Sequence, residues 1–167
     1  MPEANYPDPR ITPGGSDRPD WPLIESHVRQ LATNYTMGTD AIGRGELENG
    51  IAIFQKTFTG EAIIEVSGAP TTRRIGPVEW SGFVNDTFRG RNDVRTQHLV
   101  GSINVVLSSD TTAEMSSYMH AAHLRGTGEV QTVLLTYVDH CVKTAEGWRI
   151  AHRTLFPMSS WMEPKAP

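Results

Sequence analysis

Cysteine is almost missing from this sequence, and so are long apolar runs. The single thiol, Cys141, excludes an internal disulfide framework and offers no CxxC pair for zinc or redox chemistry. A lone cysteine of this kind is typical of a small buried side chain in a reducing compartment. No apolar stretch approaches the ~18 residues that a transmembrane helix needs. We therefore expect no membrane partner and, by default, a cytoplasmic location.

The sequence also lacks a large excess of positive or negative charge. Fifteen Lys and Arg residues against nineteen Asp and Glu residues leave a net charge of −4, and the basic residues are scattered along the chain. Nucleic acid is not an expected partner, because its recognition requires a basic patch or stripe. Six histidines are present, but no HExxH motif or Cys/His cluster accompanies them. We expect neither a bound metal nor a cofactor.

The composition changes near the N-terminus. The first nineteen residues hold five prolines and two glycines and lack the apolar segment of a signal peptide, so residues 1–19 are interpreted as a flexible arm. The rest of the chain has the length of one globular domain, and its apolar content is sufficient to bury one core. We expect a single domain at residues 20–157, followed by a C-terminal tail at residues 158–167.

The first ninety residues of the chain carry helical periodicity. Apolar residues recur at three- and four-residue steps in three segments, each bounded by glycine-containing or polar stretches, and this spacing predicts three helices. The segment EAIIEVSG between the second and third helix is typical of a short strand, and a polar loop follows it. The predicted helices lie at residues 20–40, 47–60 and 77–90.

The residue composition changes after residue 90. Four segments rich in Val, Ile, Thr, Leu and Tyr are separated by the turn sequences SSD, RGTGE and TAEG, which predicts an antiparallel meander. Helices first and long strands after them predict an α+β fold, with three N-terminal helices packed on one face of a strongly curved, mainly antiparallel sheet. Strands this long must bend, and a bent sheet covered by helices encloses a pocket. The predicted strands are residues 94–108, 112–125, 130–143 and 147–156.

Polar side chains interrupt the first long strand, VRTQHLVGS at residues 94–102. Strand alternation places His98 and Ser102 on one face, and on the next strand Met119 and His123 share a face with small side chains that leave room. A hollow face of this composition is typical of a pocket for a small hydrophobic molecule. The residues expected to bind the substrate are Ser102, Met119 and Tyr137.

Each polar candidate also has a structural interpretation. Asp40 could cap or end its helix, and Tyr35 could be a core residue whose hydroxyl bonds to the backbone. A single strand histidine such as His98 is often structural or exposed. Arg153 could pair with Asp139 or lie at a solvated strand edge. The residues alone leave these alternatives open.

Three stretches of the sequence resemble a known family. They are Tyr35-x4-Asp40, RTQHLVGS at the start of the first long strand, and GWRI at the start of the last. Together they resemble the SnoaL-like branch of the nuclear transport factor 2 superfamily, and within it the scytalone dehydratases and bile-acid 7α-dehydratases. The similarity runs from about residue 22 to residue 156. It implies a cone-shaped α+β barrel, and relatives of this type are commonly trimers.

The resemblance also implies roles for individual residues. Asp40 corresponds to the helix carboxylate that holds an imidazole, and His98 corresponds to the catalytic base. His123, 25 residues later, falls at the position of the second active-site histidine. Tyr35 matches a tyrosine of the bile-acid dehydratases. The arginine that these enzymes and the related dehydrochlorinases use on the last strand falls at Arg153, or at the preceding histidine if a bulge shifts the register.

The sequence departs from the scytalone dehydratase pattern at two positions. Thr39 and Val66 stand where that enzyme has tyrosines that help to hold the substrate carbonyl. Their absence argues against scytalone itself as the substrate. It also moves the role of acid, or of the group that polarises the carbonyl, to Tyr35, with Tyr137 as a helper.

This set of residues predicts general acid–base chemistry. A neutral imidazole held by a carboxylate is a general base with a fixed tautomer, and a second polar group can polarise a carbonyl. We expect a cofactor-free hydro-lyase that eliminates water from a hydrophobic cyclic hydroxy-ketone or a steroid- or polyketide-like compound. The alternatives are an isomerase or cyclase of the same superfamily and a non-catalytic small-molecule-binding protein. The mixed outer face with Tyr118 and His120 permits a homo-oligomer, and a trimer is favoured.

Overall fold

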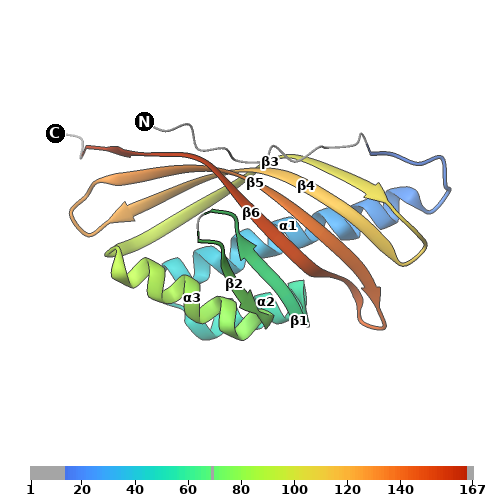
Figure 1. The fold of residues 1–167 in the computed structure, drawn as a ribbon, viewed down its shortest axis with the longest axis horizontal. Helices are drawn as coiled ribbons and strands as arrows, with labels where there is room; N and C mark the ends of the chain where they lie inside the picture. Colours follow the sequence, from blue (N-terminus) through green and yellow to red (C-terminus); the bar gives the residue numbers. More distant parts are fainter. Residues whose placement is uncertain (1–13, 69, 165–167) are drawn as a thin grey trace.

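The computed structural model describes residues 14–68 and 70–164, which form three helices and one six-stranded sheet (Figure 1). The helices are α1 (Trp21–Gly43), α2 (Leu47–Thr57) and α3 (Gly76–Gly90). The strands are β1 (Phe58–Val66), β2 (Thr72–Ile75), β3 (Asp93–Leu107), β4 (Thr112–Arg125), β5 (Val130–Thr144) and β6 (Gly147–Glu163). The predicted N-terminal arm lies outside the described residues up to residue 13, and the predicted tail does so from residue 165.

The sheet is mixed but mainly antiparallel. Its strand order is β2-β1-β6-β5-β4-β3, and only the contact between β1 and β6 is parallel. The four long strands arch over the three helices, which all lie on the concave side of the sheet (Figure 1). This arrangement confirms the α+β fold that the helical periodicity and the turn sequences predicted. It also places the inner face of the sheet opposite α1 and α3.

The main differences from the predicted elements lie in three places. Phe58, predicted as the last apolar residue of a helix, instead begins β1. The polar loop contains a short strand, β2, which pairs with the end of β1. The last strand continues to Glu163, because residues beyond Pro157 pair with the start of β5. Proline is tolerated there because the β5–β6 register shifts directly after it, between the pairs Pro157–Leu135 and Ser159–Leu134.

A β-bulge in β3 changes which side chains face the helices. The β3–β4 register shifts between Val100 and Ile103, so that the strict alternation of faces is broken at this point. Beyond the bulge, Val105 is buried, whereas Ser102 is exposed to solvent. The prediction that Ser102 shares the pocket face with His98 is therefore wrong.

The inner face of β4 is built as the sequence predicted. Every second residue from Ala113 to His123 is buried, and Tyr118 and His120 on the opposite face are exposed. The inner face packs with α1 and α3 into one core that includes Val28. Within the described residues, no helix has the length and apolarity needed to cross a bilayer.

Candidate active site

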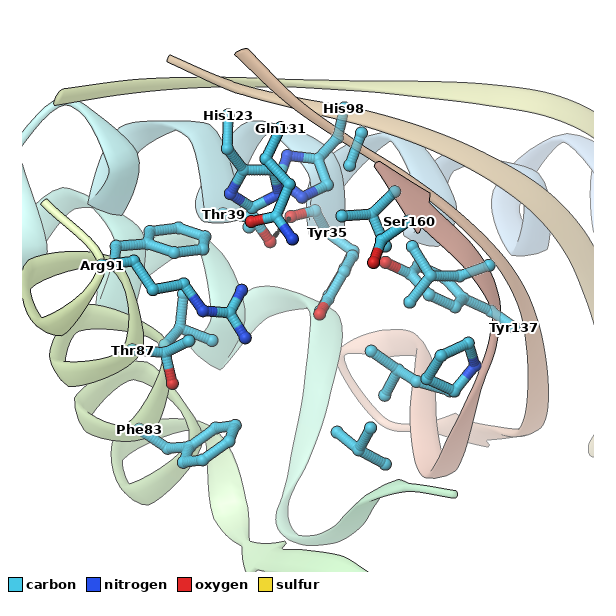
Figure 2. A pocket seen from close by; sticks show the side chains of 18 of the residues that line it. Tyr35, Thr39, Phe83, Thr87, Arg91, His98, His123, Gln131, Tyr137 and Ser160 are labelled. Atoms are coloured by element: carbon cyan, nitrogen blue, oxygen red, sulfur yellow. Dashed lines mark hydrogen bonds between the residues drawn. The ribbon is translucent and has the colours of Figure 1, made fainter. Parts of the chain in front are cut away.

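A cavity of about 350 Å³ opens between the helices and the concave face of the sheet. Most of its wall is apolar, with aromatic and aliphatic side chains from α3, β5 and β6. Four of the predicted site residues line it (Figure 2), and their side chains come from α1, β3, β4 and β5. These four residues are Tyr35, His98, His123 and Tyr137. A cavity of this size and polarity suits a small, largely apolar molecule.

The imidazole of His98 is held by the carboxylate of Asp40. The distance from His98 Nδ1 to Asp40 Oδ1 is 2.7 Å, and both side chains are largely buried. Asp40 also accepts hydrogen bonds from the Thr96 hydroxyl, at 2.8 Å, and from the His98 backbone N–H, at 3.1 Å. A carboxylate only accepts hydrogen bonds, so Nδ1 of His98 carries the proton and Nε2 keeps its lone pair. His98 lines the cavity, whereas Asp40 lies behind it.

A close approach of α1 to β3 makes this pair possible. Gly43 ends α1 directly against Thr96, and a Cβ atom at this glycine would lie only 2.2 Å from the Thr96 hydroxyl oxygen. A larger side chain would push Thr96 aside and with it one of the donors to Asp40. The glycine therefore brings the last turns of α1, which carry Asp40, within hydrogen-bonding distance of β3.

Asp40 is held in its ionised form. Burial by itself would raise the pKa of this carboxyl, but the hydrogen bonds and charge of His98 and the hydroxyl of Thr96 outweigh it, so the pKa is lowered. An ionised Asp40 stabilises positive charge on His98. The pair is thus suited to accept a proton at Nε2, on the cavity side.

A second histidine–carboxylate pair lies beside the first. His123 Nδ1 is 3.2 Å from Asp93 Oδ2, and Arg125 Nη1 is 2.8 Å from the other oxygen of this carboxylate. The rings of His98 and His123 meet edge to face at 5.5 Å, because the β3–β4 register pairs His123 with Thr96 and makes His98 its diagonal neighbour. Two imidazoles therefore face one cavity, each bonded to its own aspartate.

His123 is neutral at physiological pH. Burial and the nearby charge of His98 lower its pKa to about 4, although the carboxylate of Asp93 acts in the opposite direction. Its Nδ1 donates to Asp93, so Nε2 is left as an acceptor. His123 is thus placed to accept a hydrogen bond from a ligand.

This low pKa makes stability depend on pH. The unfolded chain takes up a proton on His123 near pH 6.5, but the folded chain does so only near pH 4. The contribution of neutral His123 to the stability of the fold is therefore complete above pH 6.5, and it is lost as the pH falls towards 4. When the pH is lowered from 7 to 4.5, protonation of His123 should lower the free energy of unfolding by about 2 kcal/mol. Urea denaturation at the two pH values measures this change. The drop should be smaller by this amount in the His123→Gln variant, but unchanged in the control His140→Gln, which replaces a half-buried histidine on the outer face of β5.

Tyr35 and Tyr137 form the floor of the cavity above a buried ion pair. Their rings meet edge to face at 5.4 Å, and the guanidinium of Arg153 lies 4.1 Å from the centre of the Tyr35 ring. Burial raises the pKa of Tyr35, only partly opposed by the charge of Arg153, so its hydroxyl stays protonated. A protonated phenol is a hydrogen-bond donor. Figure 2 shows the Tyr35 hydroxyl directed into the cavity.

Arg153 does not line the cavity. It is fully buried, and it binds Asp139 through two hydrogen bonds of 2.6 Å. Burial disfavours its charge, but the attraction of Asp139 raises the pKa of Arg153 above its usual range. The structural interpretation, in which Arg153 pairs with Asp139, is the one that the geometry supports. His152, the alternative, is also absent from the cavity wall and bonds to Glu65 at 3.1 Å.

The predicted substrate-binding residues are only partly in place. Tyr137 lines the cavity, but Ser102 lies in the β3 bulge and is exposed. Met119 is buried in the core, because the cavity reaches β4 only near its end, at Ala121 and His123. Thr39 and Val66, the positions at which the sequence departs from scytalone dehydratase, both line the cavity.

Three residues near the cavity were not anticipated from the sequence. Asp93 lies just before the predicted strand start at residue 94, yet it opens β3 and is the buried partner of His123. Arg91 follows α3 and Gln131 begins β5, and both line the cavity. No sequence signal separates these two from ordinary surface residues. In the described ranges, 14–68 and 70–164, no group of three or more His, Cys, Asp or Glu side chains is placed to hold a metal ion.

Solved structures with the same fold include proteins of several descriptions. A candidate scytalone dehydratase from Novosphingobium aromaticivorans is 23% identical, with a TM-score of 0.67 over 86% of this chain and 91% of that one. The hexachlorocyclohexane dehydrochlorinase LinA-type3 from Novosphingobium barchaimii is 12% identical, with a TM-score of 0.71 over 86% and 92%. At such identities the likeness establishes the fold alone.

The same fold occurs in a nuclear transport factor 2-like superfamily protein from Salmonella enterica, which is 13% identical, with a TM-score of 0.68 over 83% of this chain and 94% of that one. No protein of curated function matches the sequence. Residues 24–154 match the SnoaL-like domain, which covers most of the chain and all of the long strands except the end of β6. The chain therefore belongs to the SnoaL-like family and has the nuclear transport factor 2-like fold.

Proposed function

We propose that this protein is a cofactor-free lyase that eliminates water from a hydrophobic cyclic hydroxy-ketone. The observation that carries the proposal is the Asp40–His98 pair, whose free Nε2 faces an apolar cavity that also receives the Tyr35 hydroxyl. A carboxylate-held imidazole is a general base, and an apolar cavity strengthens its electrostatic interactions with the substrate. The structural relatives described as a dehydratase and a dehydrochlorinase are lyases, in agreement with this class of reaction.

The proposed reaction is a β-elimination. Nε2 of His98 removes a proton from the carbon next to the carbonyl, while the Tyr35 hydroxyl donates a hydrogen bond to the carbonyl oxygen. The electrons of the C–H bond form the C=C bond, and the C–O bond at the β-carbon breaks with its electrons on oxygen. The imidazolium of His98 gives its proton to this oxygen, which leaves as water. The imidazole of His123 is neutral and unprotonated at Nε2, so it accepts a hydrogen bond from the leaving hydroxyl and orients it.

A simple β-hydroxy-ketone tests this reaction. The probe 3-hydroxy-1-tetralone yields 1-naphthol when it loses water, and the product is followed by absorbance and mass spectrometry. We expect the protein to accelerate the loss of water over the spontaneous rate. An isomerase would give a product of unchanged mass, and a binding protein would raise the melting temperature with no turnover. Either result would contradict the proposal.

We propose in addition that the outer face of the sheet joins copies of this chain into a homo-oligomer, with a trimer favoured. Leu99, Tyr118 and Met158 are 53%, 51% and 61% exposed, and all three line one shallow apolar groove on this face. Exposed large apolar side chains gathered in one place are typical of a protein–protein contact.

Leu99→Asp tests this interface. A buried carboxylate without a partner would oppose association, so we expect the variant to be monomeric in light scattering while the wild type has the mass of a trimer. The matched control is Val78→Asp, which changes an exposed apolar residue on α3, away from the groove. A monomeric wild type, or an oligomeric Leu99→Asp variant, would contradict this interface.

A further inference from the structure

Arg91 gives the cavity a feature that the proposed elimination does not use. Among the residues that line the cavity, Arg91 is the only Lys, Arg, Asp or Glu side chain. It lies at the C-terminal end of α3, and Figure 2 shows its guanidinium reaching into the cavity on the side of Gln131 and His123. Its charge is one of the causes that lower the pKa of His123, in agreement with this position. Arg91 is exposed, so it lies where the cavity meets solvent, and a single cation at this place favours a ligand with one anionic group.

The guanidinium of Arg91 is not engaged elsewhere in the described part of the chain. No hydrogen bond or ion pair of its side chain occurs there, whereas Arg89 and Arg125, which lie close to it, are both engaged. Arg89 donates to the last carbonyl oxygens of α1, and Arg125 pairs with Asp93. The protein carries a net charge of −4, so an attraction for acids at this place is local rather than general.

Gln131 adds a second donor beside Arg91. Its side-chain oxygen accepts a hydrogen bond from the Arg125 guanidinium. Because arginine can only donate, this contact fixes the orientation of the amide and leaves the NH2 group free. In Figure 2 the amide nitrogen of Gln131 points towards the interior of the cavity, on the same side as Arg91. Arg125 thus positions Gln131 as well as Asp93.

The apolar wall next to these donors comes from α3. Phe83, Val84 and Phe88 line the cavity along α3, the helix that Arg91 follows directly. We propose that the substrate carries a carboxylate, bound between the Arg91 guanidinium and the Gln131 amide, and that its ring packs against these side chains. Two planar donor groups suit the two oxygens of a carboxylate. The inference rests on the proposed function in taking this cavity as the substrate site, and it narrows the substrate to hydroxy-ketones that also carry an acid.

Two probes that differ in one group test this inference. 2-Naphthoate and 2-naphthamide have the same ring and nearly the same shape, but only the first is an anion at pH 7.5. Isothermal titration should show that the wild type binds naphthoate at least tenfold more tightly than naphthamide. In Arg91→Gln this preference should fall to about twofold or less, with the affinity for naphthamide unchanged. The control Arg95→Gln removes an exposed positive charge of β3 outside the cavity and should keep the wild-type preference.

Three results would overturn the carboxylate site. They are an equal affinity of the wild type for both probes, a preserved preference in Arg91→Gln, and an equal loss in Arg95→Gln. Melting curves of the variants, matched to the wild type, exclude a folding defect as the cause of a loss. Binding of these probes needs no turnover. A preference for naphthoate without dehydration of 3-hydroxy-1-tetralone overturns the proposed reaction alone, and dehydration without the preference overturns the carboxylate site alone.

Discussion

Replacement of His98 by Gln is expected to lower kcat/KM for the dehydration of 3-hydroxy-1-tetralone by about 10³-fold, since a positioned general base typically contributes a factor of this order. Glutamine fills a similar volume and can still donate a hydrogen bond to Asp40, but it cannot accept the substrate proton. Asp40→Asn should also lower the rate by about 10²-fold or more, because the amide neither fixes the imidazole tautomer nor stabilises its cation. Steady-state formation of 1-naphthol measures both effects.

The matched control for this prediction is His140→Gln. This histidine is half-buried on β5 and pairs with Glu114 on the outer surface, at 2.7 Å. Its replacement should leave kcat/KM within about twofold of the wild type. If His98→Gln kept turnover within tenfold of the wild type, the loss of transition-state stabilisation would be under about 1.4 kcal/mol. A loss that small is incompatible with His98 as the base.

Replacement of Arg153 by Met is expected to lower the free energy of unfolding by about 3–5 kcal/mol, the usual cost of removing one partner of a buried ion pair. Asp139 would be left ionised or forced to take up a proton in a site where it is 0% exposed. The guanidinium also lies against the rings of Tyr35 and Tyr137, at 4.1 and 4.7 Å, so its packing would be lost as well. Urea denaturation followed by circular dichroism measures the change.

Two further variants separate the ion pair from its packing. The double variant Arg153→Met, Asp139→Leu removes both charges and should recover part of the lost stability, because no unpaired buried charge remains. Arg149→Met on the same strand is the control, since its partner Glu146 is largely exposed and such pairs contribute about 1 kcal/mol or less. A loss of under about 1 kcal/mol in Arg153→Met would contradict the structural importance of the pair.

The fold could be predicted because its signals are local. The helical spacing of apolar residues and the turn sequences between the long strands depend only on neighbouring residues. The errors arose where pairing at a distance decides the outcome. The short strand β2 exists because it pairs with the end of β1, and β6 continues beyond Pro157 because the start of β5 lies beside it. The one local sign of the bulge in β3, which exposes Ser102, is Gly101 inside the strand, and a glycine alone does not fix where the register shifts.

The centre of the site could be predicted by resemblance, and its surroundings could not. Asp40 and His98 lie 58 residues apart, and periodicity has no means of pairing them, but the similarity to dehydratases did so. Asp93 could not be singled out from the sequence, because its role depends on the β3–β4 register that sets it opposite Arg125. Arg153 points to the inside of the fold, as expected. Its guanidinium does not reach the cavity, because it pairs with the buried Asp139 on the neighbouring strand.

The most direct test of the account is whether His98 removes a proton next to a carbonyl. The cyclic ketone 1-tetralone has such protons but no leaving group, so proton removal in D2O appears as deuterium at the carbon beside the carbonyl. Melting curves with 1-tetralone establish first that it binds to both proteins. We predict that the wild type accelerates deuterium incorporation, measured by proton NMR, and that His98→Gln exchanges at the spontaneous rate. Equal exchange rates in the two proteins would contradict the account.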